Sequence, residues 1–536
     1  GTSNQIFKFR NLFVQDDFGT YEFRSISDFE DGNPYSYNYS YLLPGGNRAA
    51  EFSAIQLGGY VQDKWTVQPN LKLTFGLRAD VPIMPDDPTA NPDVADAFPE
   101  YRTDRVASGN ILWSPRFGFN WAPDTGEYTT QIRGGAGIFS GTPPFVWISN
   151  QYSNTGADYG RIDARFFEAS WGDGFFSPDP NNQPTPDGSN GLPTVETTEV
   201  NLIEQDFKYP QAAKFNLAVD QDLPYGITAT LEGIYSKSIN AVTYRNINLG
   251  QTGSSAYGRP LYGDIFYNSF FGTASGSPNR LDSRFTNALV LDNTDKGYNY
   301  SITAELNKQF DWGLRANVSY TYNRAESVNN GTSSRAISNW QYNENFDVNN
   351  PRIGTADFER RHRILANVGY TFSWADRMRT TISVIFDGRS GTPFSWIYDG
   401  NANGDTRYDN DLMYVPASQD EVVLTSGNWN ELNDWIASES SLNEYRGEVV
   451  PRGTAREPWT NFLDFLINQE IETFSGQKLE ITASMFNVLN FINEDWGLRE
   501  GVSFNNYRAV QFEQYVDQDF IDNRGSGLGL TSDDIG

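Results

Sequence analysis

The chain of 536 residues contains no cysteine and a single histidine. Without cysteine there is no disulfide framework, thiolate zinc site or thiol nucleophile, and one histidine excludes a multi-histidine metal site. The formal net charge of −28 argues against nucleic-acid binding, which requires basic patches that contact phosphates. The sequence also lacks any run of about 18 apolar residues, so it predicts no transmembrane helix. These absences disfavour enzymes and helical membrane proteins.

Alternation of apolar and polar residues dominates what the sequence does contain. In residues 71–80 every odd position is apolar and every even position is polar or glycine, and residues 314–323 and 478–485 also alternate. A period of two predicts β-strands with one apolar face, because a helix requires a period near 3.6. Many of these segments reach about ten residues, the length at which tilted strands cross a membrane.

The connections between the predicted strands alternate in length. Short turns such as 123–126 and 310–313 join strands in pairs, and long polar segments separate the pairs. The long segments are 83–109, 141–209, 241–296, 327–360 and 391–459. Such loops are uncommon in compact soluble domains, whereas outer-membrane barrels combine short periplasmic turns with long extracellular loops. The pattern predicts an all-β fold, a transmembrane antiparallel β-barrel, in preference to a soluble multi-sheet sandwich.

The strands and loops also set the predicted domain organisation. We count about 13 or 14 strands by their period, including less regular ones near 35–42 and 505–513. No linker divides the chain, so residues 1–536 are predicted to be part of a single outer-membrane β-barrel. Within the long extracellular loop 391–459, apolar residues at helical spacings in 428–444 predict a short helix.

One loop carries the spacing of a calcium site, and Ca²⁺ is the one candidate cofactor. In residues 399–405, oxygen-bearing residues occupy positions 1, 3, 5 and 7 and glycine occupies position 6, as in the first half of an EF-hand loop. Position 12 is Asn410 instead of glutamate, so a neighbouring aspartate would have to replace that ligand. The predicted ligands are Asp399, Asn401, Asn403, Asp405, Asp409 and Asp411. The alternative is a solvated Asn/Asp/Gly turn.

Several of these segments resemble hairpins of a known family. The sequence GGYVQDKWTVQPNLKLTFGLRADVP (58–82) resembles a hairpin of TonB-dependent outer-membrane transporters. Later hairpins of the same barrels are similar to residues 298–325, 357–372, 390–396 and 483–493. The Oar-like subgroup is similar to residues 214–240, 403–416 and 445–459. The agreement follows the order and spacing of the family over nearly the whole chain.

This resemblance implies that the chain forms most of a 22-stranded barrel, a size of barrel whose lumen is plugged. Residue 1 onward is already typical of barrel sequence, so we expect the plug domain and the N-terminal strands to lie outside this chain. Residues 532–536 lack the terminal aromatic strand of such barrels, so we also expect the last strand to be missing.

The resemblance further implies transport of a bulky nutrient, such as an oligopeptide or a glycan, across the Gram-negative outer membrane. This chain would form the barrel wall and the extracellular loops that capture the substrate, and we predict no enzymatic activity. The expected partners are outer-membrane lipid, the plug domain and missing strands of the same barrel, a TonB-type energy-coupling protein that contacts the absent segment, and a surface lipoprotein. Two alternatives stay open: an Oar-like barrel for protein export or surface display, and a secreted β-rich adhesin or glycan-binding protein.

Overall fold

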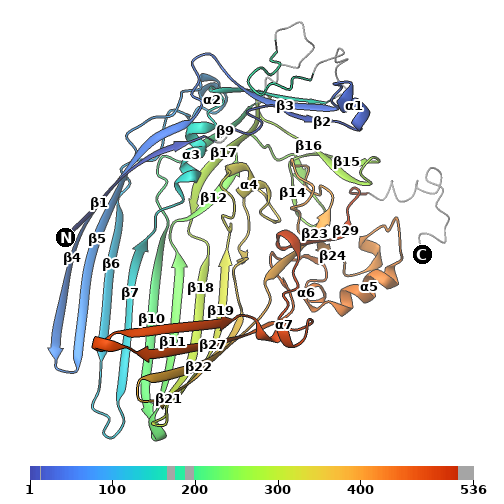
Figure 1. Cartoon of the computed structure of the whole chain (residues 1–536). Helices are drawn as coiled ribbons and strands as arrows, with labels where there is room; N and C mark the ends of the chain where they lie inside the picture. Colours follow the sequence, from blue (N-terminus) through green and yellow to red (C-terminus); the bar gives the residue numbers. More distant parts are fainter. Residues whose placement is uncertain (13, 166–175, 187–197, 517–536) are drawn as a thin grey trace.

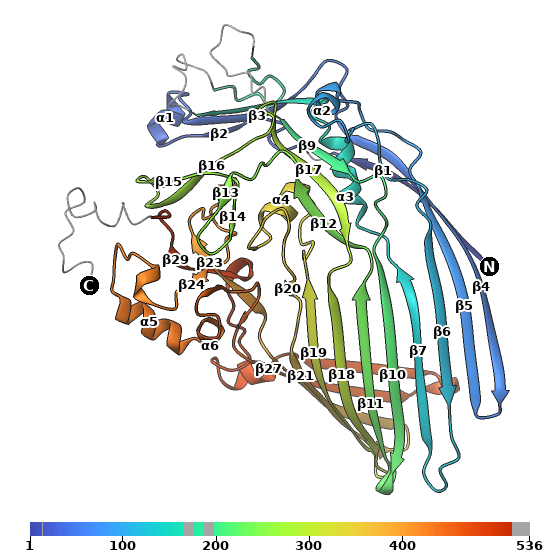
Figure 2. The ribbon, with the colours of Figure 1, turned by 180° about the vertical axis from the view of Figure 1, so that it is seen from behind.

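The computed structural model describes residues 1–12, 14–165, 176–186 and 198–516. Its dominant element is a 14-stranded sheet whose neighbouring strands are antiparallel. This sheet, which we call the wall, is a curved layer of long strands that lie side by side (Figures 1 and 2). In order across the wall, the strands are β1 (Thr2–Asn11), β4 (Ala50–Gln68), β5 (Leu71–Ile83), β6 (Leu112–Trp121), β7 (Thr130–Ser140), β10 (Gln211–Leu223), β11 (Ile227–Ser238), β18 (Tyr298–Gln309), β19 (Leu314–Ser327), β21 (His362–Ala375), β22 (Met378–Arg389), β27 (Thr460–Glu472) and β28 (Lys478–Met485), and β20 (Gly354–Thr355) pairs with β19.

Alternation along the strands places apolar side chains on one exposed face of the wall. On β18, Ile302 and Leu306 expose 51% and 48% of their surface, and Leu306 pairs with Val318 on β19, which is 44% exposed. The intervening Thr303 points to the other face, where its hydroxyl lies 2.9 Å from that of Thr321. Apolar surface on this scale is stable in contact with lipid rather than water. The predicted antiparallel, membrane-facing strands are therefore confirmed.

Short turns close the hairpins at one end of the wall (Figure 1). Two of them are single 3₁₀ turns, Pro224–Gly226 and Phe474–Gly476. Their central residues Tyr225 and Ser475 have φ angles of +67° and +59°, so each turn reverses the chain through the left-handed region. This end matches the short-turn side that the sequence predicts.

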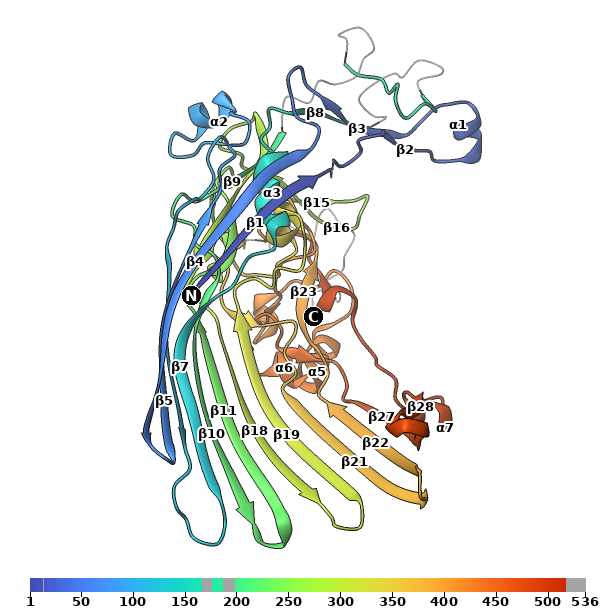
Figure 3. The same ribbon diagram turned by 60° about the vertical axis from the view of Figure 1, so that its left-hand side comes forward.

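The long connections gather at the other end of the wall and along its concave side (Figure 3). We call the described residues of 84–111, 141–210, 239–297, 328–361 and 390–459 the loop assembly. Its helices and those of the flanking segments are α1 (Ile26–Glu30), α2 (Pro92–Ala97), α3 (Phe145–Ser153), α4 (Ala336–Gln341), α5 (Trp429–Ser438), α6 (Ser440–Asn443) and α7 (Val488–Ile492). Helices α5 and α6 confirm the helix predicted within 428–444, and Asn428 caps α5 by accepting a hydrogen bond from the Glu431 amide.

Small sheets tie these loops together. They comprise β2 (Thr20–Glu22), β3 (Ser36–Leu42) and β8 (Tyr159–Arg165); β9 (Thr198–Ile203), β12 (Ala241–Asn246) and β17 (Phe285–Thr294); β13 (Gly253–Ser254) and β14 (Pro260–Leu261); β15 (Gly263–Asn268) and β16 (Thr273–Pro278); β23 (Pro393–Asp399), β26 (Ala455–Arg456) and β29 (Asn506–Gln511); and β24 (Tyr414–Val415) and β25 (Glu448–Val449). The strands predicted near 35–42 and 505–513 are β3 and β29, which belong to these sheets and not to the wall.

The hydrophobic core of the described residues lies mainly in the loop assembly. Trp340 and Ile148 are 2% exposed and Leu289 is 1% exposed within one large cluster, and Ile436 and Leu442 are fully buried in a second cluster beside β23. Among the described helices, none has the length and apolar character needed to span a bilayer. The loops are thus packed bodies with their own cores.

Candidate functional site

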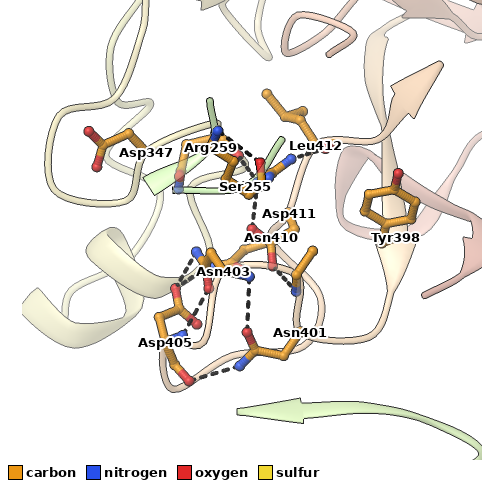
Figure 4. A network of polar contacts seen from close by, with 12 residues as sticks. Ser255, Arg259, Asp347, Tyr398, Asn401, Asn403, Asp405, Asn410, Asp411 and Leu412 are labelled. Carbon is orange, nitrogen blue, oxygen red and sulfur yellow. Dashed lines mark hydrogen bonds and ion pairs between the residues drawn. The ribbon is translucent and has the colours of Figure 1, made fainter. Parts of the chain in front are cut away.

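The predicted calcium loop, residues 399–411, lies inside the loop assembly between β23 and β24 (Figure 4). Asn401, Asn403, Asp405 and Asp411 are at most 2% exposed. The hairpin of β15 and β16 packs against this loop: a Cβ on Gly404 would lie 2.6 Å from the Gly263 carbonyl oxygen. Because Gly404 also has a φ of +74°, glycine is required there by both space and backbone conformation.

A fully buried ion pair anchors the end of this loop. Arg259 Nη1 lies 2.7 Å from Asp411 Oδ1, and neither side chain is exposed. Arg259 also donates to the Leu412 carbonyl oxygen, and the Ala402 amide donates to Asp411 Oδ2 at 2.7 Å. Burial raises the pKa of Asp411, and the charge of Arg259 opposes that rise. The pair fixes residues 402–412 against the segment that precedes β14.

The two asparagines of the predicted ligand set hold the turn itself. Asn401 Oδ1 accepts hydrogen bonds from the Asn403 amide at 3.3 Å and the Gly404 amide at 2.7 Å. Asn403 Oδ1 accepts from the Asp405 amide at 2.9 Å. The side-chain oxygens of both asparagines are therefore used to satisfy backbone N–H groups, as in Asx turns.

Asp405 is the one predicted acidic ligand with no cationic partner among the described residues. Its Oδ2 accepts from Asn403 Nδ2 at 3.0 Å and Asn410 Nδ2 at 3.4 Å, and its Oδ1 accepts from the Arg407 amide at 2.6 Å. Burial, followed by the charge of Asp411, raises the pKa of Asp405 to about 7.

The remaining predicted acids face arginines at the edge of the loop. Asp399 lies 3.3 Å from Arg508 on β29, and Asp409 lies 2.6 Å from Arg407 and 3.1 Å from Arg508. Within the described ranges, no cluster of three or more acidic or histidine side chains is arranged to hold a metal ion. The oxygens of the predicted ligands already accept hydrogen bonds from amide groups or pair with arginines, so their arrangement in this structure does not fit a bound calcium ion. Calcium binding therefore stays a prediction.

Sequence reasoning identified the loop but not the partners that complete it. Arg259, which neutralises Asp411, is more than 100 residues away along the chain. Asn345, whose backbone N–H donates to the Asn410 carbonyl oxygen at 3.0 Å, also lies in a different long loop. Nothing in the local spacing of 399–411 points to either residue. The surplus of acidic residues in this loop does indicate that cationic residues elsewhere must compensate their charge, but it does not say which ones.

Comparison with known proteins finds a matching family model. A family model described as "Outer membrane beta barrel domain" matches residues 1–495. No curated protein matches the chain significantly.

Several solved structures are similar in shape at low identity. A mutant of the ferric enterobactin receptor PfeA from Pseudomonas aeruginosa is 11% identical, with a TM-score of 0.39 over 85% of this chain and 44% of that chain. The siderophore receptor PirA from Acinetobacter baumannii is 12% identical, with a TM-score of 0.38 over 85% and 47%. The FrpB iron transporter from Neisseria meningitidis is 11% identical, with a TM-score of 0.39 over 91% and 51%. The chain thus spans about half the length of these structures.

Proposed function

The chain belongs to the family of outer-membrane β-barrel domains, and on this basis we propose that it takes part in TonB-dependent uptake of a bulky nutrient. Membership of the family confirms the predicted location in the bacterial outer membrane. In the proposal, the wall supplies part of the barrel and the loop assembly captures the substrate at the extracellular mouth. Energy would come from a TonB-type protein that acts on a plug domain.

The division between a lipid-facing wall and a packed loop assembly is the observation that carries this proposal. Loops that only connect strands need no interior, whereas these loops enclose hydrophobic clusters and the buried Arg259–Asp411 pair. Helices α5 and α6 and strand β23 lie on the concave side of the wall, where a lumen would open (Figure 3). A rigid body over the mouth favours selective capture over free diffusion, because preorganised side chains lose less entropy when they bind.

Fractionation is the first test. The full-length protein should partition with outer membranes, require detergent for extraction, and migrate faster on a denaturing gel when it is not heated. A protein that stays soluble without detergent would contradict the barrel and favour the adhesin alternative.

Uptake is the second test. A deletion strain should lose accumulation of labelled oligopeptides or glycans from a mixed pool, and complementation should restore it. A protonophore should abolish the same uptake in the parent strain, because TonB-type coupling draws on the inner-membrane proton gradient. Uptake that persists with the protonophore, or in the deletion strain, would overturn the proposal.

We also propose that further strands and a plug domain complete this barrel. In the described sheet, β1 pairs only with β4 and β28 pairs only with β27, so each has one unpaired edge. An open edge in lipid costs several kcal/mol for each unsatisfied backbone group, so partners for both edges are required. Intact-mass analysis of the heat-modifiable species should reveal either a chain longer than 536 residues or a second stoichiometric chain. A species of 536 residues alone would contradict this.

Calcium binding by Asp399, Asn401, Asn403, Asp405, Asp409 and Asp411 is a separate proposal that rests on their spacing. It requires the Asn401 and Asn403 amides to turn their oxygens away from the backbone. Isothermal titration of the purified protein with millimolar Ca²⁺ tests it, with Asp405→Asn as the variant. Absence of heat in the parent protein would exclude the site.

A further inference from the structure

A cavity of about 210 Å³, lined by both polar and apolar groups, lies between the loop assembly and the segment around the end of β1, away from the 399–411 loop. Its walls come from segments far apart in sequence: the chain after β1, helix α3, strands β8 and β9, and the residues before α4. The residues that matter for its chemistry are Gln15, Asn154, Arg161, Glu199, Ser334 and Arg335. Pockets for drug-sized ligands have volumes of about 300–1,000 Å³, so this smaller cavity suits a small molecule or the end of a larger one.

Contacts across the cavity hold its walls together. Asn150 on α3 donates from Nδ2 to the Ser334 carbonyl oxygen at 2.8 Å. Asn11 Nδ2 donates to Ser149 Oγ at 2.9 Å, which joins the end of β1 to the same helix. At Gly156, where φ is +71°, an added Cβ would lie 2.7 Å from Val200 Cγ1, so glycine permits close packing against β9. The cavity is thus built by tertiary contacts and not by one loose loop.

Two arginines and one glutamate give the cavity charges of both signs. Burial raises the pKa of Glu199, and this rise is opposed by the charge of Arg335, by a hydrogen bond from Asn201 Nδ2 to Glu199 Oε1 at 3.3 Å, and by the charge of Arg161. Arg161 already lies 3.8 Å from Asp16. The Arg335 guanidinium forms no hydrogen bond or ion pair with any residue that the structure describes, although it lines the same cavity as Glu199. One cation and one carboxylate therefore share the cavity without pairing to each other.

The rest of the lining selects against other ligand classes. The lining includes a single aromatic side chain, Tyr159, so the cavity has little aromatic surface on which a sugar could stack. A simple anion would be attracted by Arg335 but repelled by Glu199. A simple cation would be attracted by Glu199 but repelled by Arg335. A molecule with both charges satisfies both groups, and buried charges are stable only when they are paired.

We propose that this cavity binds a short unblocked peptide of about dipeptide size, whose carboxylate contacts Arg335 and whose ammonium group contacts Glu199. This inference changes the substrate of the proposed function from a bulky nutrient to a short peptide, and only its relevance to uptake rests on that function. Binding itself is a property of the purified protein. Gln15 and Asn154 supply further donors and acceptors for the peptide bond.

Calorimetry on the full-length protein in detergent tests the proposal with Ala-Ala as the probe. N-acetyl-Ala-Ala lacks the ammonium group and Ala-Ala-amide lacks the carboxylate, so each should bind at least about tenfold more weakly, equivalent to about 1.4 kcal/mol. Arg335→Gln should weaken Ala-Ala binding by the same factor while leaving the affinity for Ala-Ala-amide unchanged. Glu199→Gln should give the mirrored result, with the loss confined to ligands that carry a free ammonium group.

The control variant is Arg102→Gln, which removes an exposed arginine that pairs with Asp104 outside the cavity and should leave all affinities unchanged. Heat-modifiable migration checks that each variant is folded. Absence of Ala-Ala binding at about 10 mM, or equal affinities for the free and blocked dipeptides, would overturn the inference. If uptake stays protonophore-sensitive while Ala-Ala fails to bind, only this inference fails; if Ala-Ala binds but uptake ignores the protonophore, only the proposed function fails.

Discussion

Ile302 and Leu231 in the wall expose 51% and 57% of their surface, whereas Trp340 and Ile436 in the loop assembly expose 2% and 0%. The same kinds of side chain are thus turned outward in one region and inward in the other. The difference follows from the surrounding solvent. Apolar side chains are stable in contact with lipid along the wall, whereas apolar side chains in the loops must be buried away from water. The same chain therefore exposes apolar side chains in the wall and buries them in the loop assembly.

The polar groups follow the reverse pattern. In the wall, the polar face carries partly exposed pairs such as Arg133 with Asp220 at 3.0 Å. In the loop assembly, Arg259 and Asp411 pair with no exposure at all. A charge pair shielded from water is costly to break, whereas an exposed pair contributes little. This comparison predicts that similar substitutions will change stability by different amounts in the wall and in the loop assembly.

The largest effect should come from the buried pair. Arg259→Met leaves Asp411 charged without a partner, which should destabilise the loop assembly by about 3–5 kcal/mol. Hydrogen exchange of residues 399–412 would measure this as a loss of protection, while exchange in the wall strand β18 should stay unchanged. The added change Asp411→Asn should restore much of the protection, and a failure to do so would mean that the pair does not hold the loop.

A charge on the lipid face should have the next largest effect. Ile302→Arg places a guanidinium in the middle of β18 on the apolar face, at a cost of about 2–4 kcal/mol near the bilayer midplane. The measured quantity is the heat-modifiable fraction in outer membranes. Thr303→Arg, one residue along on the opposite face, is the matched control and should be tolerated. Equal losses for both variants would contradict the assignment of the two faces.

A buried acid between α4 and β20 should make the loop assembly sensitive to pH. Glu344 is 7% exposed and accepts a hydrogen bond from Asn506 Nδ2 at 3.0 Å. Burial raises the pKa of Glu344 from 4.5 to about 7. Between these two values the folded state binds more protons than the unfolded state, so Glu344 lowers stability as pH rises through the window.

The variant Glu344→Gln removes this dependence. Relative to the parent protein, it should be more stable at pH 8 by at most about 3 kcal/mol and equal to it near pH 4. Thermal unfolding of the two proteins across this range measures the difference. A gain that is the same at every pH would show that titration of Glu344 is not its cause.

The smallest effect should come from an exposed pair at the end of the wall. Arg10 and Glu51 lie 2.9 Å apart across β1 and β4, with side chains 65% and 66% exposed. Exposed pairs contribute about 0–1 kcal/mol, so Arg10→Gln should leave the melting temperature nearly unchanged. A loss as large as that of Arg259→Met would remove the contrast between the two regions.

The wall could be predicted from the sequence because each strand carries its own evidence. Residues 314–323 alternate strictly, and the structure places them in β19. Strand β1 was missed because residues 2–5 are all polar, which hides the alternation of its later residues. The parallel pairing of β29 with β23 was also missed, since alternation specifies a strand but not its partner.

The site is less predictable than the wall for the same reason. The 399–411 spacing was recognised, but Arg259 and Arg508 lie about as far from it in sequence as a whole small domain is long. Likewise, Glu199 and Arg335 come from separate loops and share a cavity only after the fold forms. Local pattern does not encode such distant pairings, because only tertiary packing brings these residues together.

The pairing of β29 with β23 sets an order of events in biogenesis. Ser395 and Asn506 are neighbours in this parallel ladder, yet the hairpin of β27 and β28 lies between them in the chain. Contacts between residues so far apart form late, because a long stretch of chain must be ordered first. The mouth can therefore mature only after the last described hairpin of the wall has been made.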